Sequence, residues 1–126
     1  MDKPYNIRER ARRFADDVLV FSRRLRAKGP IYEHIVEQLN DAAGSIGANL
    51  SEGKDGESKK DFIHKNAVSL KEANESNYWL KRAWAAEVSL RKQAEPLIQE
   101  SRELISILTA IVVKAKKRKS RGDNVD

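Results

Sequence analysis

The sequence predicts an all-α protein, folded as an antiparallel up-and-down four-helix bundle. Apolar residues recur at spacings of three and four along four long segments, which is the pattern of amphipathic helices. Short turns join the segments, and no βαβ alternation or hairpin signal competes with this pattern. A length of 126 residues suits one domain. We expect the bundle to occupy residues 1–118 and a flexible basic, polar tail to follow at 119–126.

The first helix is predicted over residues 6–27, and Asn6 is suited to cap its N-terminus. Gly29 and Pro30 end this helix, because glycine favours the position after a helix and proline cannot continue one. One face of the helix is apolar and should point into the core. Its residues are Ile7, Ala11, Phe14, Val18, Phe21 and Leu25.

The second helix is predicted over residues 30–52, with Pro30 in its first turn and Gly53 as its stop. Gly44 and Gly47 fall inside it, and each costs about 1 kcal/mol of helix stability relative to alanine. We therefore expect another helix to cross closely at this point. The apolar face comprises Ile31, Ile35, Leu39, Ala42, Ala43, Ile46 and Leu50.

The third helix is predicted over residues 58–86, and the fourth over residues 90–118. Ser58 followed by Asp61 resembles a capping box, and Pro96 suits the early part of the fourth helix. Trp84 fits the inward stripe of the third helix. Tyr78 and Trp79 fall partly off that stripe, so they would seat a neighbouring subunit or stack on a base.

A polar stripe runs along the second helix beside its apolar face, and it contains Gln38, Ser45, Asn49 and Glu52. The favoured interpretation is a set of buried hydrogen bonds to a neighbouring helix. Candidate partners on the third helix are Glu72, Asn74, Ser76 and Asn77. The alternative is a ligand or catalytic pocket around Asn49 and Glu52, but one amide and one carboxylate do not make a catalytic set.

The composition argues against several classes of chemistry. Cysteine is absent, which excludes disulfides, thiolate metal sites and cysteine nucleophiles and makes a cytoplasmic location the simplest expectation. His34 and His64 lie on different predicted helices without metal-ligand spacing. There is no phosphate-binding loop, and no apolar run approaches a membrane span. We expect no enzymatic activity, no catalytic residues, no metal, no cofactor and no membrane partner.

The net charge of +6 is concentrated at the two ends of the chain. Residues 1–28 carry nine Lys and Arg against four Asp and Glu, and residues 114–126 carry six against two. This asymmetry favours an RNA or DNA partner contacted through its phosphates. An anionic protein partner, a role in solubility and pairing with the helix dipole are the alternatives. The candidate residues are Arg8, Arg12, Arg23, Arg26, Lys114, Lys116, Lys117, Arg118, Lys119 and Arg121.

The second-helix motif resembles that of the small bundle proteins encoded by intervening sequences of bacterial large-subunit ribosomal RNA genes. The resemblance covers roughly residues 10 to 112, and its structural motif residues are Gln38, Ser45, Gly47, Asn49, Glu52, Gly53 and Glu72. It implies a four-helix bundle that assembles into rings of five and has no established enzymatic activity. Relatives that work with the reverse transcriptase of diversity-generating retroelements bind nucleic acid. A protein-interaction scaffold without nucleic-acid binding is the alternative function.

Overall fold

The computed structural model describes residues 6–56 and 58–120, except for the side chain of Lys119. It confirms the all-α prediction, since four long helices account for most of these residues. Two short 3₁₀ turns, η1 and η2, lie in the first and third connections, at Pro30–Tyr32 and Val88–Leu90. The long helices are α1 (Ile7–Arg26), α2 (Glu33–Lys54), α3 (Lys59–Ala86) and α4 (Arg91–Ser120).

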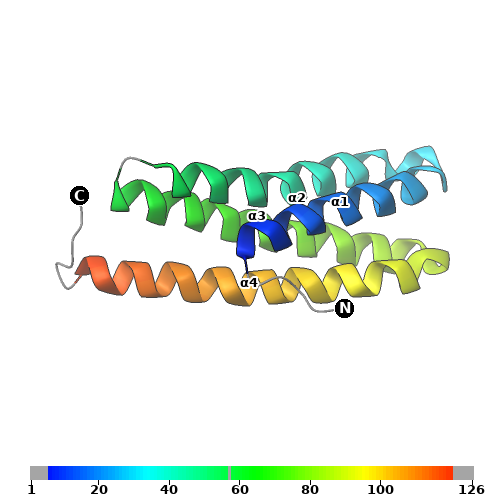
Figure 1. Ribbon diagram of the computed structural model, residues 1–126. Coiled ribbons are helices and arrows are strands. Elements are labelled where there is room, and N and C mark those ends of the chain that lie inside the picture. The colour runs from blue at the N-terminus through cyan, green and yellow to red at the C-terminus, as the bar shows by residue number, and fades with distance from the viewer. Residues whose placement is uncertain (1–5, 57, 121–126) are drawn as a thin grey trace.

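The helices run up and down, and each is antiparallel to the next in sequence (Figure 1). One end of the bundle carries the α2–α3 turn and the C-terminal end of α4, and the opposite end carries the other two turns. Helix α1 begins part of the way along the bundle and ends at that opposite end (Figure 1). The end that carries the α2–α3 turn therefore consists of α2, α3 and α4.

Two predicted helix starts are confirmed by their capping bonds. The Oδ1 of Asn6 accepts a hydrogen bond of 2.9 Å from the backbone N–H of Arg8. The Oγ of Ser58 accepts one of 3.1 Å from the backbone N–H of Asp61. Gly29 follows α1 at φ 153°, a backbone conformation that other residues rarely adopt. These local signals fix where α1 and α3 begin and where α1 ends.

The second and fourth helices differ from their predicted ranges. Pro30 begins the 3₁₀ turn, and α2 itself starts at Glu33. Gly53 was expected to stop α2, but it lies inside a helix that continues to Lys54, so that expectation is wrong. Helix α4 continues through Ser120, into the segment expected to be a tail, and residues 121–126 of that tail lie outside the described residues.

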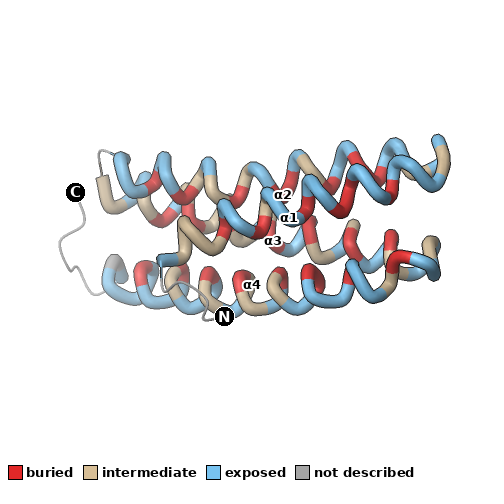
Figure 2. The backbone as a smooth tube through the Cα atoms, turned by 45° about the vertical axis from the view of Figure 1, so that its right-hand side comes forward, coloured by how far each residue is buried: buried red, intermediate tan, exposed pale blue. Residues whose placement is uncertain are grey.

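The core follows most of the predicted apolar stripes, and the buried positions of each helix face the other helices (Figure 2). Ile31 was expected on the apolar face of the second helix, but it lies in the turn η1 and is 83% exposed, so that expectation is wrong. Phe14, Leu39, Ile46, Leu80 and Leu104 are among its largest fully buried side chains. Trp84 was expected in the core, but it is only half-buried and packs against it. The bundle thus has one continuous hydrophobic centre with an indole at its margin.

The helical glycines of α2 have three different surroundings. A Cβ added at Gly47 would lie 3.7 Å from the Cβ of Ala11, so α1 does cross closely there. At Gly53 an added Cβ would lie 2.9 Å from the Cβ of Lys65 on α3, which is closer than real contacts allow. At Gly44 nothing lies within 4 Å, so the expected close approach is absent at that residue.

Candidate nucleic-acid interface

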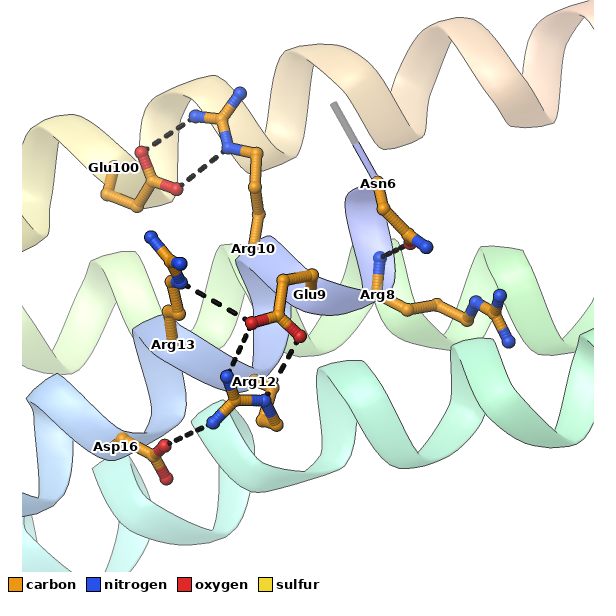
Figure 3. Close-up of polar contacts among 8 residues, drawn as sticks. All are labelled: Asn6, Arg8, Glu9, Arg10, Arg12, Arg13, Asp16 and Glu100. Atoms are coloured by element: carbon orange, nitrogen blue, oxygen red, sulfur yellow. Dashed lines mark hydrogen bonds and ion pairs between the residues drawn. The ribbon is translucent and has the colours of Figure 1, made fainter. Parts of the chain in front are cut away.

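The arginines of α1 are largely engaged with nearby carboxylates. Arg12 is exposed and pairs with Glu9 and, at 3.0 Å, with Asp16 (Figure 3). Hydrogen bonding to Arg12 is the main cause of a lowered pKa of Glu9. Arg26 pairs with Glu33 of α2 at 2.7 Å. Local pairing of this kind reduces the charge that these two side chains offer to an anionic partner.

Arg8 and Arg23 are the two predicted α1 arginines that form no ion pair with another described residue. The Arg8 guanidinium extends away from the carboxylates drawn in Figure 3. Arg23 is exposed near the opposite end of α1. These two cations are available to a partner, but they lie at opposite ends of α1.

Arg10, which the sequence did not single out, has the most structured ion pair of α1. Its guanidinium donates to both carboxylate oxygens of Glu100 on α4, at 3.0 and 2.7 Å, and to Glu103 at 2.9 Å. The side chains of Arg10 and Glu100 are only 11% and 18% exposed. This ion pair joins α1 to α4 and so has a structural role (Figure 3).

The predicted cations of α4 lie on its last turns. Lys114, Lys116, Lys117 and Arg118 are all exposed, and none forms an ion pair with another described residue. Lys119 belongs to α4, but its side chain is outside the described part of the structure. Arg121 lies outside the described residues altogether. Four unpaired cations within five positions exceed what the dipole of one helix terminus requires.

Two further lysines lie at this end of the bundle because of its topology. Lys54 ends α2 and Lys59 begins α3, and Figures 1 and 2 place their turn at the same end as the C-terminus of α4. The exposed carboxylates Asp55 and Asp61 also lie there, so the surface is not uniformly positive. We name this surface the basic end. It comprises Lys54, Lys59, Lys114, Lys116, Lys117 and Arg118.

The structure does not bring the two predicted basic segments together. Arg23 and Arg26 lie in the last turns of α1, at the end of the bundle opposite the basic end (Figure 1). Arg8 and Arg12 lie near the start of α1, part of the way along. The cationic surface is therefore concentrated at the basic end, with scattered arginines elsewhere.

The polar stripe of α2 does not form the expected buried hydrogen bonds to α3, and only its exposed member Glu52 bonds to that helix among the described residues. The Oγ of Ser45 donates to the carbonyl of Asp41 at 2.7 Å, and the amide of Asn49 donates to the carbonyl of Ser45 at 2.8 Å. Both bonds stay within α2, because short polar side chains reach the carbonyl four residues earlier. Gln38 is exposed.

The expected partners on α3 also bond elsewhere. Asn74 and Ser76 donate to carbonyls of their own helix, and Asn77 donates to the Oγ of Ser101 on α4. A buried hydrogen bond between α2 and α3 is made instead by Ser69, whose Oγ donates to the carbonyl of Ile46 at 2.9 Å. Ser69 lies three residues before the motif residue Glu72, and its role depends on packing that the sequence alone does not reveal.

The carboxylates of the motif have separate surroundings. Glu52 is exposed and pairs with Lys65 of α3 at 2.9 Å, so it is not enclosed with Asn49 in a pocket. Glu72 is half-buried, and desolvation is the main cause of its raised pKa, followed by a hydrogen bond with Glu75. Glu52 therefore contacts a neighbouring helix, whereas Glu72 contacts a carboxylate of its own helix.

Within the described part of the chain, no three His, Asp or Glu side chains are grouped so that they would hold a metal ion. None of the helices in residues 6–56 and 58–120 has both the length and the hydropathy that a membrane crossing requires.

The fold and its exposed cations define a class of protein, an all-α bundle with a basic end and an interhelical motif on α2. The family model described as 23S rRNA-intervening sequence protein matches residues 3–110. The chain belongs to this family, which confirms the resemblance read from its motif.

A crystal structure from Bacteroides thetaiotaomicron, a protein of unknown function from the S23 ribosomal protein family, is similar in fold. It shares 30% sequence identity with a TM-score of 0.76, and the match covers 85% of this chain and 98% of that one. A search of curated proteins finds no match.

Proposed function

We propose that this protein is a non-enzymatic, self-assembling bundle that binds nucleic acid through its basic end. The observation that carries the proposal is the group of exposed cations on the last turns of α4, which have no acidic partner among the described residues. Placing like charges together is unfavourable for an isolated domain unless an anionic partner offsets their repulsion.

The placement of these side chains suits phosphates rather than bases. Successive residues of a helix turn by about 100°, so Lys114, Lys116, Lys117 and Arg118 point in different directions around α4. Lysine acts as a point charge toward phosphate, and phosphate contacts carry no base-sequence information. The proposed mode is therefore attachment to the backbone of RNA or DNA without sequence selection.

Exposed apolar side chains support self-assembly. Leu19 and Val20 are exposed on α1, and Ile31 and Val88 are exposed in the turns η1 and η2. Contact between copies would remove this apolar surface from water. The family resemblance implies rings of five, and several basic ends in one assembly would raise the avidity for a long polyanion.

Fluorescence anisotropy with labelled single-stranded RNA and duplex DNA tests the proposal, with light scattering to give the assembly mass. Binding should weaken at least tenfold when the four α4 cations are replaced by alanine, in the variant Lys114→Ala, Lys116→Ala, Lys117→Ala and Arg118→Ala. A control variant should retain most of the affinity, because it removes four exposed cations outside the basic end that also form no ion pair with a described residue. It carries Arg24→Ala, Lys28→Ala, Arg82→Ala and Lys92→Ala.

A protein-interaction scaffold is the second candidate, and the same exposed apolar residues favour it. Equal loss of affinity in both variants would mean that binding depends on the net charge of the protein and not on the basic end, which would contradict the proposal. Absence of binding to either nucleic acid at low salt would contradict the proposal and favour the scaffold. A cytoplasmic location, where nucleic acid is accessible, belongs to the same proposal.

A further inference from the structure

A groove between α3 and α4 is lined by one aromatic side chain and two exposed cations. It is open to solvent, has a volume of about 680 Å³, and lies away from the basic end. Pockets of about 300–1,000 Å³ are typical of small-ligand sites. We name it the Trp84 groove. Its lining residues are Lys81, Trp84, Ala85, Glu95, Ile98, Gln99 and Arg102.

The indole of Trp84 is held in a fixed orientation at the margin of the core. Its Nε1 donates a hydrogen bond of 3.0 Å to a carboxylate oxygen of Glu95 on α4. The guanidinium of Arg91 lies 3.9 Å from the centre of the indole ring, in a cation–π contact. Trp84 lines the groove and Arg91 does not.

Two cations at this groove have no acidic partner among the described residues. Lys81 on α3 and Arg102 on α4 are both exposed. Glu95, the carboxylate that lines the groove, is held by the indole N–H. The groove therefore combines an aromatic surface with free positive charge, and the amide of Gln99 adds hydrogen-bonding capacity.

We propose that the Trp84 groove binds an unpaired base of single-stranded nucleic acid, an inference that rests on the proposed function. The base would lie against the indole, and Lys81 and Arg102 would hold the neighbouring phosphates. Stacking on aromatic side chains is the common way in which proteins hold single strands, because every base offers a flat face. A duplex keeps its bases stacked on one another, so it would not occupy this groove.

Trp79 is less suited to the same role. Its ring packs edge-on against His34 of α2 and against Tyr78, with ring centres 5.4 and 4.9 Å apart. These two rings already contact the Trp79 indole, so less of it is available to a base. The difference between the two tryptophans makes it possible to follow Trp84 by fluorescence after Trp79 is removed.

The test is a titration of the Trp79→Phe protein, in which Trp84 is the remaining tryptophan, with oligodeoxythymidine and with a duplex of the same length. The expected result is saturable quenching of Trp84 emission by the single strand and little quenching by the duplex. The Lys81→Ala, Arg102→Ala variant should weaken single-strand binding about tenfold, and both positions are exposed, so the fold should persist.

The outcomes separate this inference from the proposed function. If the single strand binds by anisotropy and the α4 variant weakens it, while Trp84 emission stays unchanged, the base site is wrong and the basic end remains the interface. If Trp84 is quenched equally by duplex, selectivity for an unpaired base is wrong. If neither nucleic acid binds, both proposals are contradicted.

Discussion

Gly53 and Gly44 are both inside α2, yet the structure gives them opposite surroundings. Replacing Gly53 with alanine would place a Cβ 2.9 Å from the Cβ of Lys65 and 3.2 Å from the side-chain amide of Asn66. Both neighbours belong to α3, so the helices would have to move apart. A residue that appeared to end a helix thus controls how closely two helices approach.

We predict that Gly53→Ala lowers the free energy of unfolding by about 1–3 kcal/mol, because overpacking outweighs the better helix propensity of alanine. Gly44→Ala should raise it by up to about 1 kcal/mol, since nothing lies within 4 Å of the new methyl group. Urea denaturation of both variants measures the difference. Equal effects of the two substitutions would contradict the close approach at Gly53.

Glu72 provides a prediction that depends on pH. Its half-buried carboxyl group has a raised pKa, mainly through desolvation, so folding favours the protonated form. This contribution to stability is present below the ordinary carboxyl pKa of about 4.3 and is lost as pH rises through the raised value. At neutral pH the charged group therefore opposes folding.

Glu72→Gln should raise the melting temperature at pH 7 by a few degrees. The gain should vanish at about pH 3.5, where the parent glutamate is mostly protonated and, like the glutamine, neutral. Partial exposure of Glu72 keeps the effect below about 1 kcal/mol. Glu52→Gln is the matched control, because Glu52 is exposed and loses an ion pair instead. A Glu72→Gln gain that is independent of pH would contradict this account.

At the scale of the elements, the ion pairs of α1 differ in how far they are sheltered from water. Arg10 joins α1 to α4 through a two-bond contact with Glu100 and a third bond to Glu103. Arg12, two residues further along the helix, pairs only within α1 and is 59% exposed. Removing one partner of a sheltered ion pair costs more folding stability than removing one partner of an exposed pair, because the charge left behind is poorly solvated.

We therefore predict that Arg10→Ala costs about 1–3 kcal/mol of unfolding free energy, whereas Arg12→Ala costs less than about 1 kcal/mol. Chemical denaturation at low and high salt measures both. Salt should reduce the small Arg12 effect more, since exposed charges are screened more effectively. If the two substitutions cost the same, the Arg10 contact does not hold α1 on the bundle.

Local signals made the elements predictable. The caps at Asn6 and Ser58 depend on residues two or three positions away, and the apolar stripes follow the helical period. The Arg10–Glu100 pair joins residues 90 positions apart, and its existence depends on how α1 lies against α4. The close surroundings of Gly53 likewise depend on how α3 packs against α2. Its sequence neighbours alone do not reveal this contact, so it looked like a helix stop.

The candidate interface was predictable only in part, for the same reason. The run of lysines in α4 is visible in the sequence, but the addition of Lys54 and Lys59 requires knowing which turn shares its end of the bundle. Conversely, Arg12 and Arg26 appear as free cations in the sequence and are paired in the structure. Ion pairing within the protein therefore decides how much positive charge a side chain offers to a binding partner.

At the scale of the whole molecule, the two ends of the bundle differ in the side chains that they expose. The basic end gathers lysines from α2, α3 and α4, while the opposite end exposes Ile31 and Val88 in the turns η1 and η2. Tyr32 links those turns by donating a hydrogen bond to Glu87 at 3.0 Å. Self-association away from the basic end would leave its cations free for a polyanion.

The most direct test of this account is the salt dependence of single-stranded RNA binding by the parent protein and the four-alanine α4 variant. Each lost phosphate contact should reduce the slope of log Kobs against log salt by about 0.7, so the slope should fall by up to about 3. The variant that removes four charges elsewhere should keep the parent slope. An unchanged slope in the α4 variant, or no binding by the parent at low salt, would contradict the central claim.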